Sequence, residues 1–348
     1  MSTSTTNSDA GTTRVSSRKI IGIWIVLLAI LVPIACWRVI ETFRHHGHAT
    51  IGDGLTVESY GFDLTDSKVS ADRLDPEVKK DAVEAMVTPE TMLGKDVKAH
   101  NEAIHGKFLV SKDRVVGISL NGESRAYPIR ILNWHEIVND VVGGVPIAVT
   151  YSPMCDSVVV FDRRVGGQTR EFGLSGLLLN ANHILYDRQD DPKQESLWSQ
   201  LKFQAIAGPA GRDDLKLKVL PSRVAQWSEW LESNPQTSVI MGQLLYTKRY
   251  KRDPYGPYFS FGRLQSPVDP MPPSDDPRGL MTRIVAIYDG TNWVVSPLSA
   301  DDGNAVKGVT GVNGVVWNGD NPPTFRLESM DRPTVTSCWF AWYAMHGS

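Results

Sequence analysis

The chain has 348 residues, of which 41% are hydrophobic and 22% are charged, and its formal net charge is -3. This composition is ordinary for a globular protein with a sizeable core, in one large or two ordinary domains. The small negative charge, without a basic stripe long enough to follow a row of phosphates, argues against nucleic-acid binding, and three cysteines exclude a disulfide-rich scaffold.

The N-terminal residues predict a membrane anchor. Residues 1–19 are rich in Ser and Thr and predict a disordered tail, whereas Ile20 to Trp37 are uncharged and mostly apolar. At about 1.5 Å per residue, such a segment just crosses a hydrocarbon core of roughly 30 Å. We expect a transmembrane signal-anchor at residues 20–40.

Two alternatives compete with the anchor. A cleaved signal peptide lacks a well-placed small-x-small site after the apolar run, and a lipoprotein signal ending at Cys36 is disfavoured by Pro33. Basic residues before the segment slightly outnumber those just after it, which favours a cytoplasmic N-terminus. The predicted localisation is therefore the cell membrane, single-pass, with an extracytoplasmic C-terminal body.

The body is predicted to begin with a linker and helical cap at residues 41–107. Within it, Asp75–Val87 has an acidic start, an early Pro and apolar residues at helical spacing, and Pro89 would end this helix. The main domain is expected at residues 108–246. Residues 247–348 are expected to form an irregular arm and a C-terminal β segment.

Strand patterns dominate from Arg114 onward. The runs Arg114–Leu120 and Arg125–Ile129 flank Asn121-Gly122, a strong hairpin signal. The region Ile131–Val141 could hold one or two helical turns. After the next Gly-Gly turn, Val145–Tyr151 and Ser157–Phe161 predict two strands on either side of a Ser-Pro-Met-Cys corner.

A weak internal similarity links the main domain to the C-terminal segment. Arg283–Leu298 aligns without gaps on Arg114–Ile129, with the Arg, the β-branched run and the Pro in register. Either a hairpin unit is duplicated or two hairpins are alike by chance. The many short strands and few helices predict a β-dominated α+β fold, in a partly closed barrel or packed sheets.

Several long motifs follow one another in order along the chain: R-A-Y-P-I-R-I-L-N-W-H-E-I-V-N-D (Arg125–Asp140), V-T-Y-S-P-M-C-D-S-V-V-V-F-D-R (Val149–Arg163), F-G-L-S-G-L-L-L-N-A-N (Phe172–Asn182), L-Y-D-R-Q (Leu185–Gln189), S-L-W-S-Q (Ser196–Gln200), R-D-P-Y (Arg252–Tyr255) and W-F-A-W (Trp339–Trp342). These motifs resemble a family of bacterial and archaeal proteins known as domain of unknown function 3179. The resemblance implies no established reaction.

Two departures from the family pattern affect the chemistry. The family usually has Cys-Pro-Leu-Cys-Gly at the corner, where this chain has Ser152-Pro153-Met154-Cys155-Asp156. The chain also inserts residues 190–194 before S-L-W-S-Q. A role that needs a pair of thiols at the corner is therefore not expected here.

His135 and Cys155 are the candidate catalytic or metal-ligating residues. A Cys and a His could hold copper or zinc, or form an activated nucleophile. Alternatively, Cys155 is a small buried hydrophobe and His135 bonds a loop. A disulfide between Cys155 and Cys338 is a further alternative, because the body would lie in an oxidising compartment.

Polar side chains in two neighbouring regions are candidates for ligand binding. Three of them follow His135 before the Gly-Gly turn, and the others lie between Gly173 and Gln200, a density that suits a polar small molecule. The alternative is that they bond the backbone of tight turns or pair with one another. The candidates are Glu136, Asn139, Asp140, Ser175, Asn180, Asn182, Asp187, Arg188 and Trp198.

Two functional hypotheses follow from these patterns. The first is a membrane-anchored extracytoplasmic metal-binding or redox enzyme with a site around His135 and Cys155. The second is a non-catalytic extracytoplasmic binding or scaffold module that recognises a polar small molecule or a partner protein. The Ser at position 152 favours the second, because the first family thiol is missing.

Overall fold

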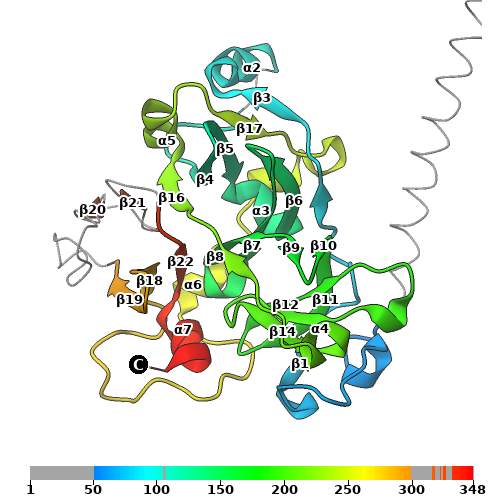
Figure 1. The fold of residues 1–348 in the computed structure, drawn as a ribbon. Helices are drawn as coiled ribbons and strands as arrows, with labels where there is room; N and C mark the ends of the chain where they lie inside the picture. The colour runs from blue at the N-terminus through cyan, green and yellow to red at the C-terminus, as the bar shows by residue number, and fades with distance from the viewer. Residues whose placement is uncertain are drawn as a thin grey trace, which may run out of the picture. The chain divides into compact units, whose positions relative to one another are not determined.

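The computed structural model describes residues 51–104, 107–298, 316–317, 322, 324–326 and 331–347. Figure 1 shows that strands outnumber helices in this part of the chain, which confirms a β-dominated α+β fold. The predicted tail and membrane segment, residues 1–40, lie outside the described residues.

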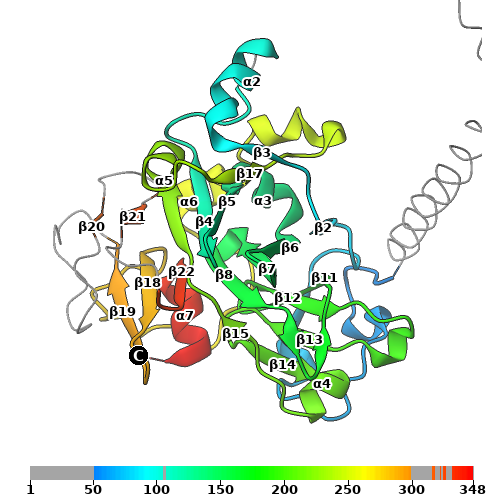
Figure 2. The ribbon, with the colours of Figure 1, turned by 45° about the horizontal axis from the view of Figure 1, so that its top comes forward.

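The largest sheet, here the large sheet, has eight strands among the described residues. It combines strands from the main domain with strands from the C-terminal segment, which lie side by side in Figure 2. Its members in spatial order are β19 (Trp293–Pro297), β18 (Arg283–Tyr288), β22 (Thr334–Cys338), β8 (Ser157–Asp162), β7 (Val145–Ser152), β6 (Ile137–Val142) and β2 (Met86–Val87), with β15 (Lys218–Val219) paired to β8.

The centre of the large sheet is buried on both faces, as β8 illustrates. All six of its residues are buried. Because side chains alternate along a strand, Val158 and Val160 pack into one hydrophobic cluster, whereas Val159 and Phe161 pack into another. A β-branched run without polar alternation is what such a doubly covered strand requires.

A five-stranded sheet packs against each face of the large sheet. Residues of the first, here the β11 sheet, belong to the same hydrophobic cluster as one face of the large sheet, and residues of the second, here the β4 sheet, belong to the same cluster as the other face. The β11 sheet contains β1 (Leu74–Pro76), β11 (Phe172–Leu179), β12 (Asn182–Asp187), β13 (Leu197–Ser199) and β14 (Gln204–Ala207). The β4 sheet contains β16 (Arg223–Gln226), β4 (Arg114–Leu120), β5 (Glu123–Pro128), β17 (Ser238–Ile240) and β3 (Thr91–Leu93).

The hairpin predicted around Asn121-Gly122 is confirmed. The strands β4 and β5 pair from Leu120 and Glu123 outward. Asn121 and Gly122 have φ values of 49° and 83°, and two positive φ values are what a tight hairpin turn of this kind needs.

The helices are short. They begin or end strands and cover sheet faces rather than forming a layer of their own. They are α2 (Val97–Ala103), α3 (Ile129–His135), α4 (Gly208–Arg212), α5 (Trp227–Ser233), α6 (Gly256–Phe261) and α7 (Trp339–His346). Single 3-10 turns are η1 (Val57–Tyr60), η2 (Ala71–Arg73), η3 (Gly94–Asp96), η4 (Pro153–Cys155), η5 (Pro192–Gln194), η6 (Leu244–Tyr246) and η7 (Arg249–Lys251). Two further two-stranded pairs are β9 (Arg164–Val165) with β10 (Gln168–Thr169), and β20 (Val316–Trp317) with β21 (Phe325–Arg326).

The helix predicted over Asp75–Val87 is wrong. The start of this stretch belongs to β1, which pairs with β11, and its end forms β2, which runs parallel to β6. Pairing with sheet edges therefore overrides a helical pattern that is only local. The helical turns predicted before the Gly-Gly turn exist as α3, but they end at His135, and β6 follows at once.

The described sheets are open, and none of them closes into a barrel. Separately, no helix within the described ranges is both long and apolar enough to span a bilayer.

Candidate functional site

A sharp corner between β7 and β8 places Asp156 at the centre of the candidate site. Pro153 begins the single turn η4, because its fixed φ suits the first position of a helical turn. Asp156 then adopts φ 43° and ψ 35°, in the left-handed region that Asp tolerates better than most residues. The chain reverses here, and the carboxylate is left only 2% exposed.

Two arginines from distant strands converge on this carboxylate. Arg114 donates from Nη1 to Oδ1 and from Nη2 to Oδ2, both at 3.1 Å. Arg283 donates from Nε to Oδ2, and the hydroxyl of Tyr151 donates to Oδ1 at 3.0 Å. Burial alone would raise the pKa of Asp156, but Arg114 and Arg283 outweigh it and hold the pKa below its ordinary value. The cluster therefore carries a net charge of about +1.

A cavity of about 290 Å³ opens beside this cluster. Its walls come from β4, α3, the corner and the segment around η7 and α6. The lining residues are Lys112, Asp113, Arg114, Ile129, Arg130, Asn133, Tyr151, Asp156, Tyr250, Lys251, Arg252, Asp253, Tyr255, Phe259, Arg283 and Pro322.

The cavity wall has more cations than anions. Six basic side chains face three carboxylates. Arg130 pairs with Asp113 at 2.6 Å, while Arg114 and Arg283 share Asp156. The three remaining cations are exposed, and none of them has a side-chain partner among the described residues: Lys112, Lys251 and Arg252.

Residues 95–310 match the model of a family described as "Protein of unknown function (DUF3179)". The matched segment spans more than half of the chain. The chain belongs to the DUF3179 family. No curated protein and no solved structure matches it. The matched segment contains every residue that lines the cavity except Pro322, so the cavity lies within the DUF3179 domain.

Three of the stretches that carry the DUF3179 resemblance meet at the cavity. Asn133 comes from the stretch Arg125–Asp140, and Asp156 comes from the stretch Val149–Arg163, which contains the corner. Arg252, Asp253 and Tyr255 come from R-D-P-Y. Segments that are far apart in the DUF3179 sequence thus build one concave surface.

Cys155 points away from solvent and is bonded internally. Its thiol is fully buried and donates to the carbonyl oxygen of Ala181, with 3.1 Å between Sγ and O. Burial raises the pKa of Cys155 to about 12. The thiol is therefore protonated at neutral pH, whereas a nucleophile or a metal ligand must be a thiolate.

His135 is buried and bonded at both ring nitrogens. Nδ1 lies 2.8 Å from the carbonyl oxygen of Glu84, which can only accept, so Nδ1 carries the proton. Nε2 then accepts from the hydroxyl of Tyr250 at 2.7 Å. Burial lowers the pKa of His135, so the ring stays neutral and fastens α3 to the segment around η7.

Glu136 forms a pair with His183, which was not among the predicted ligand-binding residues. Its Oε2 lies 3.0 Å from Nδ1 of His183, and both side chains are largely buried. The other ring nitrogen of His183, Nε2, is buried and has no hydrogen-bond partner among the described residues. Glu136 itself has φ 55°, an unusual conformation for a residue with a side chain.

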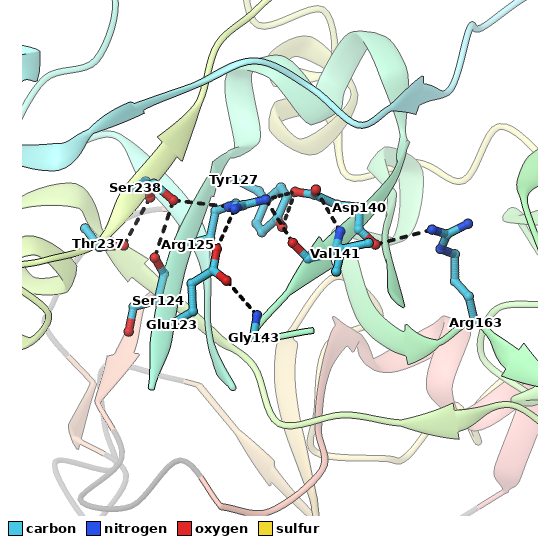
Figure 3. A network of polar contacts seen from close by, with 10 residues as sticks. All are labelled: Glu123, Ser124, Arg125, Tyr127, Asp140, Val141, Gly143, Arg163, Thr237 and Ser238. Atoms are coloured by element: carbon cyan, nitrogen blue, oxygen red, sulfur yellow. Dashed lines mark hydrogen bonds and ion pairs between the residues drawn. The ribbon is translucent and has the colours of Figure 1, made fainter. Parts of the chain in front are cut away.

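Asn139 and Asp140 connect β6 to its neighbours. The amide of Asn139 bonds both the N–H and the C=O of Phe172, as a strand partner would. Oδ2 of Asp140 accepts from Arg125 at 2.7 Å and from the hydroxyl of Tyr127 at 2.8 Å. Figure 3 shows this network reaching from Asp140 through Arg125 to β17, and it does not include any residue of the cavity wall.

Three of the predicted loop residues bond within their own region or to a neighbouring segment. Ser175 donates from its hydroxyl to the main chain of β12. Asn180 accepts from the N–H of Asp269 at 2.9 Å, and Asn182 donates to the side chain of Gln200 at 2.8 Å. All three are buried, so their polar atoms stabilise turns and strand contacts.

The other three predicted loop residues belong to buried ionic or aromatic contacts. Asp187 pairs with Arg170, whose guanidinium also lies 5.4 Å from the ring centre of Trp198. Arg188 bonds Asp81 at 3.2 Å. Trp198 is fully buried. None of the nine predicted ligand-binding residues lines the cavity beside Asp156.

The structure does not bring His135 and Cys155 into a hydrogen bond with each other; each contacts the partners given above. Within the described part of the chain, no group of three or more His, Cys, Asp or Glu side chains is arranged to hold a metal ion. Cys155 and Cys338 are both free thiols.

The sequence predictions missed the charged residues that shape the cavity, although two signals in the sequence pointed to them. Arg114 and Arg283 are the first residues of the two segments that align with each other. Asp156 stands where the resemblance implies Gly, so a charged side chain replaces a residue that has none. Neither signal reveals by itself that all three side chains meet.

Proposed function

We propose that this protein is a membrane-tethered extracytoplasmic binding protein whose cavity beside Asp156 takes a small anionic molecule. The observation that carries the proposal is the composition of the cavity wall, in which six basic side chains face three carboxylates. This is the binding-module hypothesis from the sequence, with the polar ligand now assigned a charge.

The cations without a carboxylate partner indicate that the ligand carries a negative charge. Arg114 and Arg283 are neutralised in part by Asp156, and Arg130 by Asp113. Lys112, Lys251 and Arg252 have no such partner in the described structure, and only Asp253 remains against them. A cavity lined by one sign of charge concentrates ligands of the opposite sign.

The buried cluster would hold the inner wall of the cavity rigid. Asp156 fixes the guanidinium of Arg114 in a two-bond fork, and the guanidinium of Arg283 stacks 4.6 Å from the ring centre of Phe259. Side chains that are held before binding lose little entropy when a ligand arrives. The inner wall would then determine which ligand shapes fit the cavity, and the exposed cations would attract an anionic ligand to it.

The tether is the predicted signal-anchor at residues 20–40, which places the cavity outside the cell membrane. Its support is the apolar run from Ile20 to Trp37 and the slight excess of basic residues before it. Extraction of the full chain from membranes only by detergent, and protease accessibility of the body in intact cells, test this part separately.

Calorimetric titration of the full chain in neutral-lipid nanodiscs tests the ligand proposal. We expect inorganic phosphate and succinate to bind and glucose not to bind. Arg252→Gln and Lys112→Gln should each weaken anion binding by at least fivefold, because each removes an exposed cation from the wall. Binding should also weaken as the salt concentration rises.

Lys218→Gln is the matched control, because Lys218 is also exposed but does not line the cavity. It should bind both anions as the parent chain does. Absence of anion binding in the parent chain, or equal losses in all three variants, would contradict the proposal.

A second candidate is an enzyme that uses the Glu136–His183 pair. A carboxylate on Nδ1 orients the imidazole, and its unpartnered Nε2 could take a proton from a substrate. Hydrolysis of activated esters by the full chain should then be lost in His183→Gln and kept in His135→Gln. No hydrolysis by the parent chain would reject this candidate.

The copper or zinc site predicted at His135 and Cys155 has weaker support. Both residues would have to leave their present partners, and Cys155 would have to lose a proton from a thiol whose pKa burial raises to about 12. Metal analysis of the full chain and of Cys155→Ala tests it, since equal contents in both would exclude Cys155 as a ligand.

A further inference from the structure

A second pocket of about 310 Å³ lies next to the cavity and has a different chemical character. Its wall is largely apolar, and none of the described residues that line it is Asp or Glu. We call it the apolar groove. Its lining residues are His100, Ile104, Lys107, Phe108, Arg130, Ile131, Met241, Gly242, Leu244, Thr247, Tyr250 and Lys251.

The cavity and the apolar groove adjoin each other. Arg130, Tyr250 and Lys251 line both of them. Tyr250 is fixed by its bond to His135, and Arg130 by its pairing with Asp113. Lys251 is exposed and has no partner among the described side chains, so its ammonium group can serve a ligand on either side.

The rim of the apolar groove leaves large hydrophobic side chains in water. Leu244 is 91% exposed and Ile104 is 49% exposed, and both line the groove. Exposed apolar side chains around a concave apolar wall mark a binding surface more often than an ordinary surface.

From this arrangement we infer that the ligand is an amphiphile, with an anionic head in the cavity beside Asp156 and an apolar tail in the apolar groove. The inference rests on the proposed anion binding and specifies the class of the anion. A cationic amphiphile does not fit, because the cations of both pockets would repel its head. A plain anion would leave the groove and its exposed rim unused.

A comparison of three probes tests the inference: inorganic phosphate, hexyl phosphate and hexanol. Each is titrated into the full chain in nanodiscs of neutral phosphatidylcholine. Since each methylene group withdrawn from water tightens binding by up to about fourfold, hexyl phosphate should bind at least tenfold more tightly than phosphate. Hexanol should bind more weakly than hexyl phosphate, because it lacks the charged head.

Variants at the rim separate the tail from the head. The Ile104→Ser/Leu244→Ser double variant should weaken hexyl phosphate by at least fivefold and leave phosphate unchanged. Leu245→Ser is the matched control, because Leu245 is also 91% exposed but does not line the groove. Arg252→Gln should weaken both phosphates, since it removes charge from the cavity alone.

The source of the amphiphile is tested by replacing the neutral lipid with phosphatidylglycerol. If the membrane supplies the ligand, the anionic lipid occupies the site and hexyl phosphate no longer titrates; if the ligand is a soluble amphiphile, hexyl phosphate binds as before. Equal affinities for phosphate and hexyl phosphate would overturn the inference and leave anion binding intact. If neither inorganic phosphate nor hexyl phosphate binds in neutral nanodiscs, both the amphiphile inference and the proposed anion binding are rejected.

Discussion

Two regions of this protein repeat the same backbone arrangement with different side chains. The first consists of the β4–β5 hairpin, β16 and α5, and the second of the β18–β19 hairpin, β22 and α7. In each, an arginine begins the first strand and lies opposite the residue that precedes the helix: Arg114 faces Gln226, and Arg283 faces Cys338.

The hydrogen bonds at the strand–helix junctions also correspond. The N–H of Trp227 donates to Asp113, and the N–H of Trp339 donates to Thr282, each of which directly precedes the arginine. In both regions, the next N–H donates to the carbonyl three residues before the arginine. Duplication of one segment and similarity by chance both stay interpretations of the sequence, but the strand pairing and the junction hydrogen bonds correspond at these points.

The difference between the regions lies in what the arginines do at Asp156. Arg114 reaches the carboxylate with both terminal nitrogens, whereas Arg283 uses Nε and stacks on Phe259. The carboxylate of Asp156 thus connects two similar regions, because it binds an arginine from each of them. Neither region would form the cavity wall alone, because the wall takes Arg114 from the first region and Arg283 from the second.

The largest effect is expected from removing the shared carboxylate. Asp156→Asn keeps the size and the left-handed conformation but leaves two arginines partly buried without a counter-charge. We expect the free energy of unfolding to fall by about 3–5 kcal/mol in urea denaturation. Asp253→Asn, at the exposed carboxylate of the same cavity, should change it by less than about 1 kcal/mol. Similar losses in both variants would refute the joining role of Asp156.

Replacing one arginine at a time tests whether the two regions contribute equally. Arg114→Gln should cost about 2–3 kcal/mol and Arg283→Gln somewhat less, since Arg114 makes the two-bond fork. The double variant should deviate from the sum of the single variants by about 1 kcal/mol or more, because both side chains contact one carboxylate. Additive losses measured by urea denaturation would show that the arginines act independently.

A small residue occupies the same position of the first strand in each region, three residues after the arginine. A Cβ added at Gly117 would lie 2.2 Å from the ring of Trp230, so Gly117→Ala should destabilise by about 1–3 kcal/mol through overpacking. The corresponding residue is Ala286, where a Cβ already fits. Ala286→Gly should cost about 1 kcal/mol or less. Thermal unfolding of both variants decides whether the two regions pack differently here.

The smallest effect concerns pH and His135, at the end of the helix that follows β5. Because burial lowers the pKa of His135 below 6.5, the unfolded chain takes up the proton first as the pH falls. Its contribution to stability is therefore complete above about pH 6.5 and is lost progressively as the pH falls below it. His135→Gln should flatten this part of the stability profile. An unchanged profile would assign the acid sensitivity to other groups.

Much of the local structure could be read from the residues themselves. The Asn121-Gly122 turn, the β-branched strands on either side of the corner and the DUF3179 membership were all predicted correctly. These features depend on neighbours in sequence: side-chain alternation, turn residues that accept positive φ, and ordered motifs. The Asp75–Val87 prediction failed because both ends of that stretch pair with strands far away in the sequence.

The residues alone predict a β-dominated α+β chain of the DUF3179 family, with the hairpin turn and the strands beside the corner correctly located. Which polar residues share a site follows instead from the tertiary structure. Arg114 and Arg283 lie 169 positions apart in the sequence. Arg283 reaches Asp156 because β18 and β22 join the same sheet as β7 and β8, and Arg114 reaches it because β4 packs on that sheet. Ionic contacts over such distances follow from strand order rather than from local pattern, so no local reading could have placed them together.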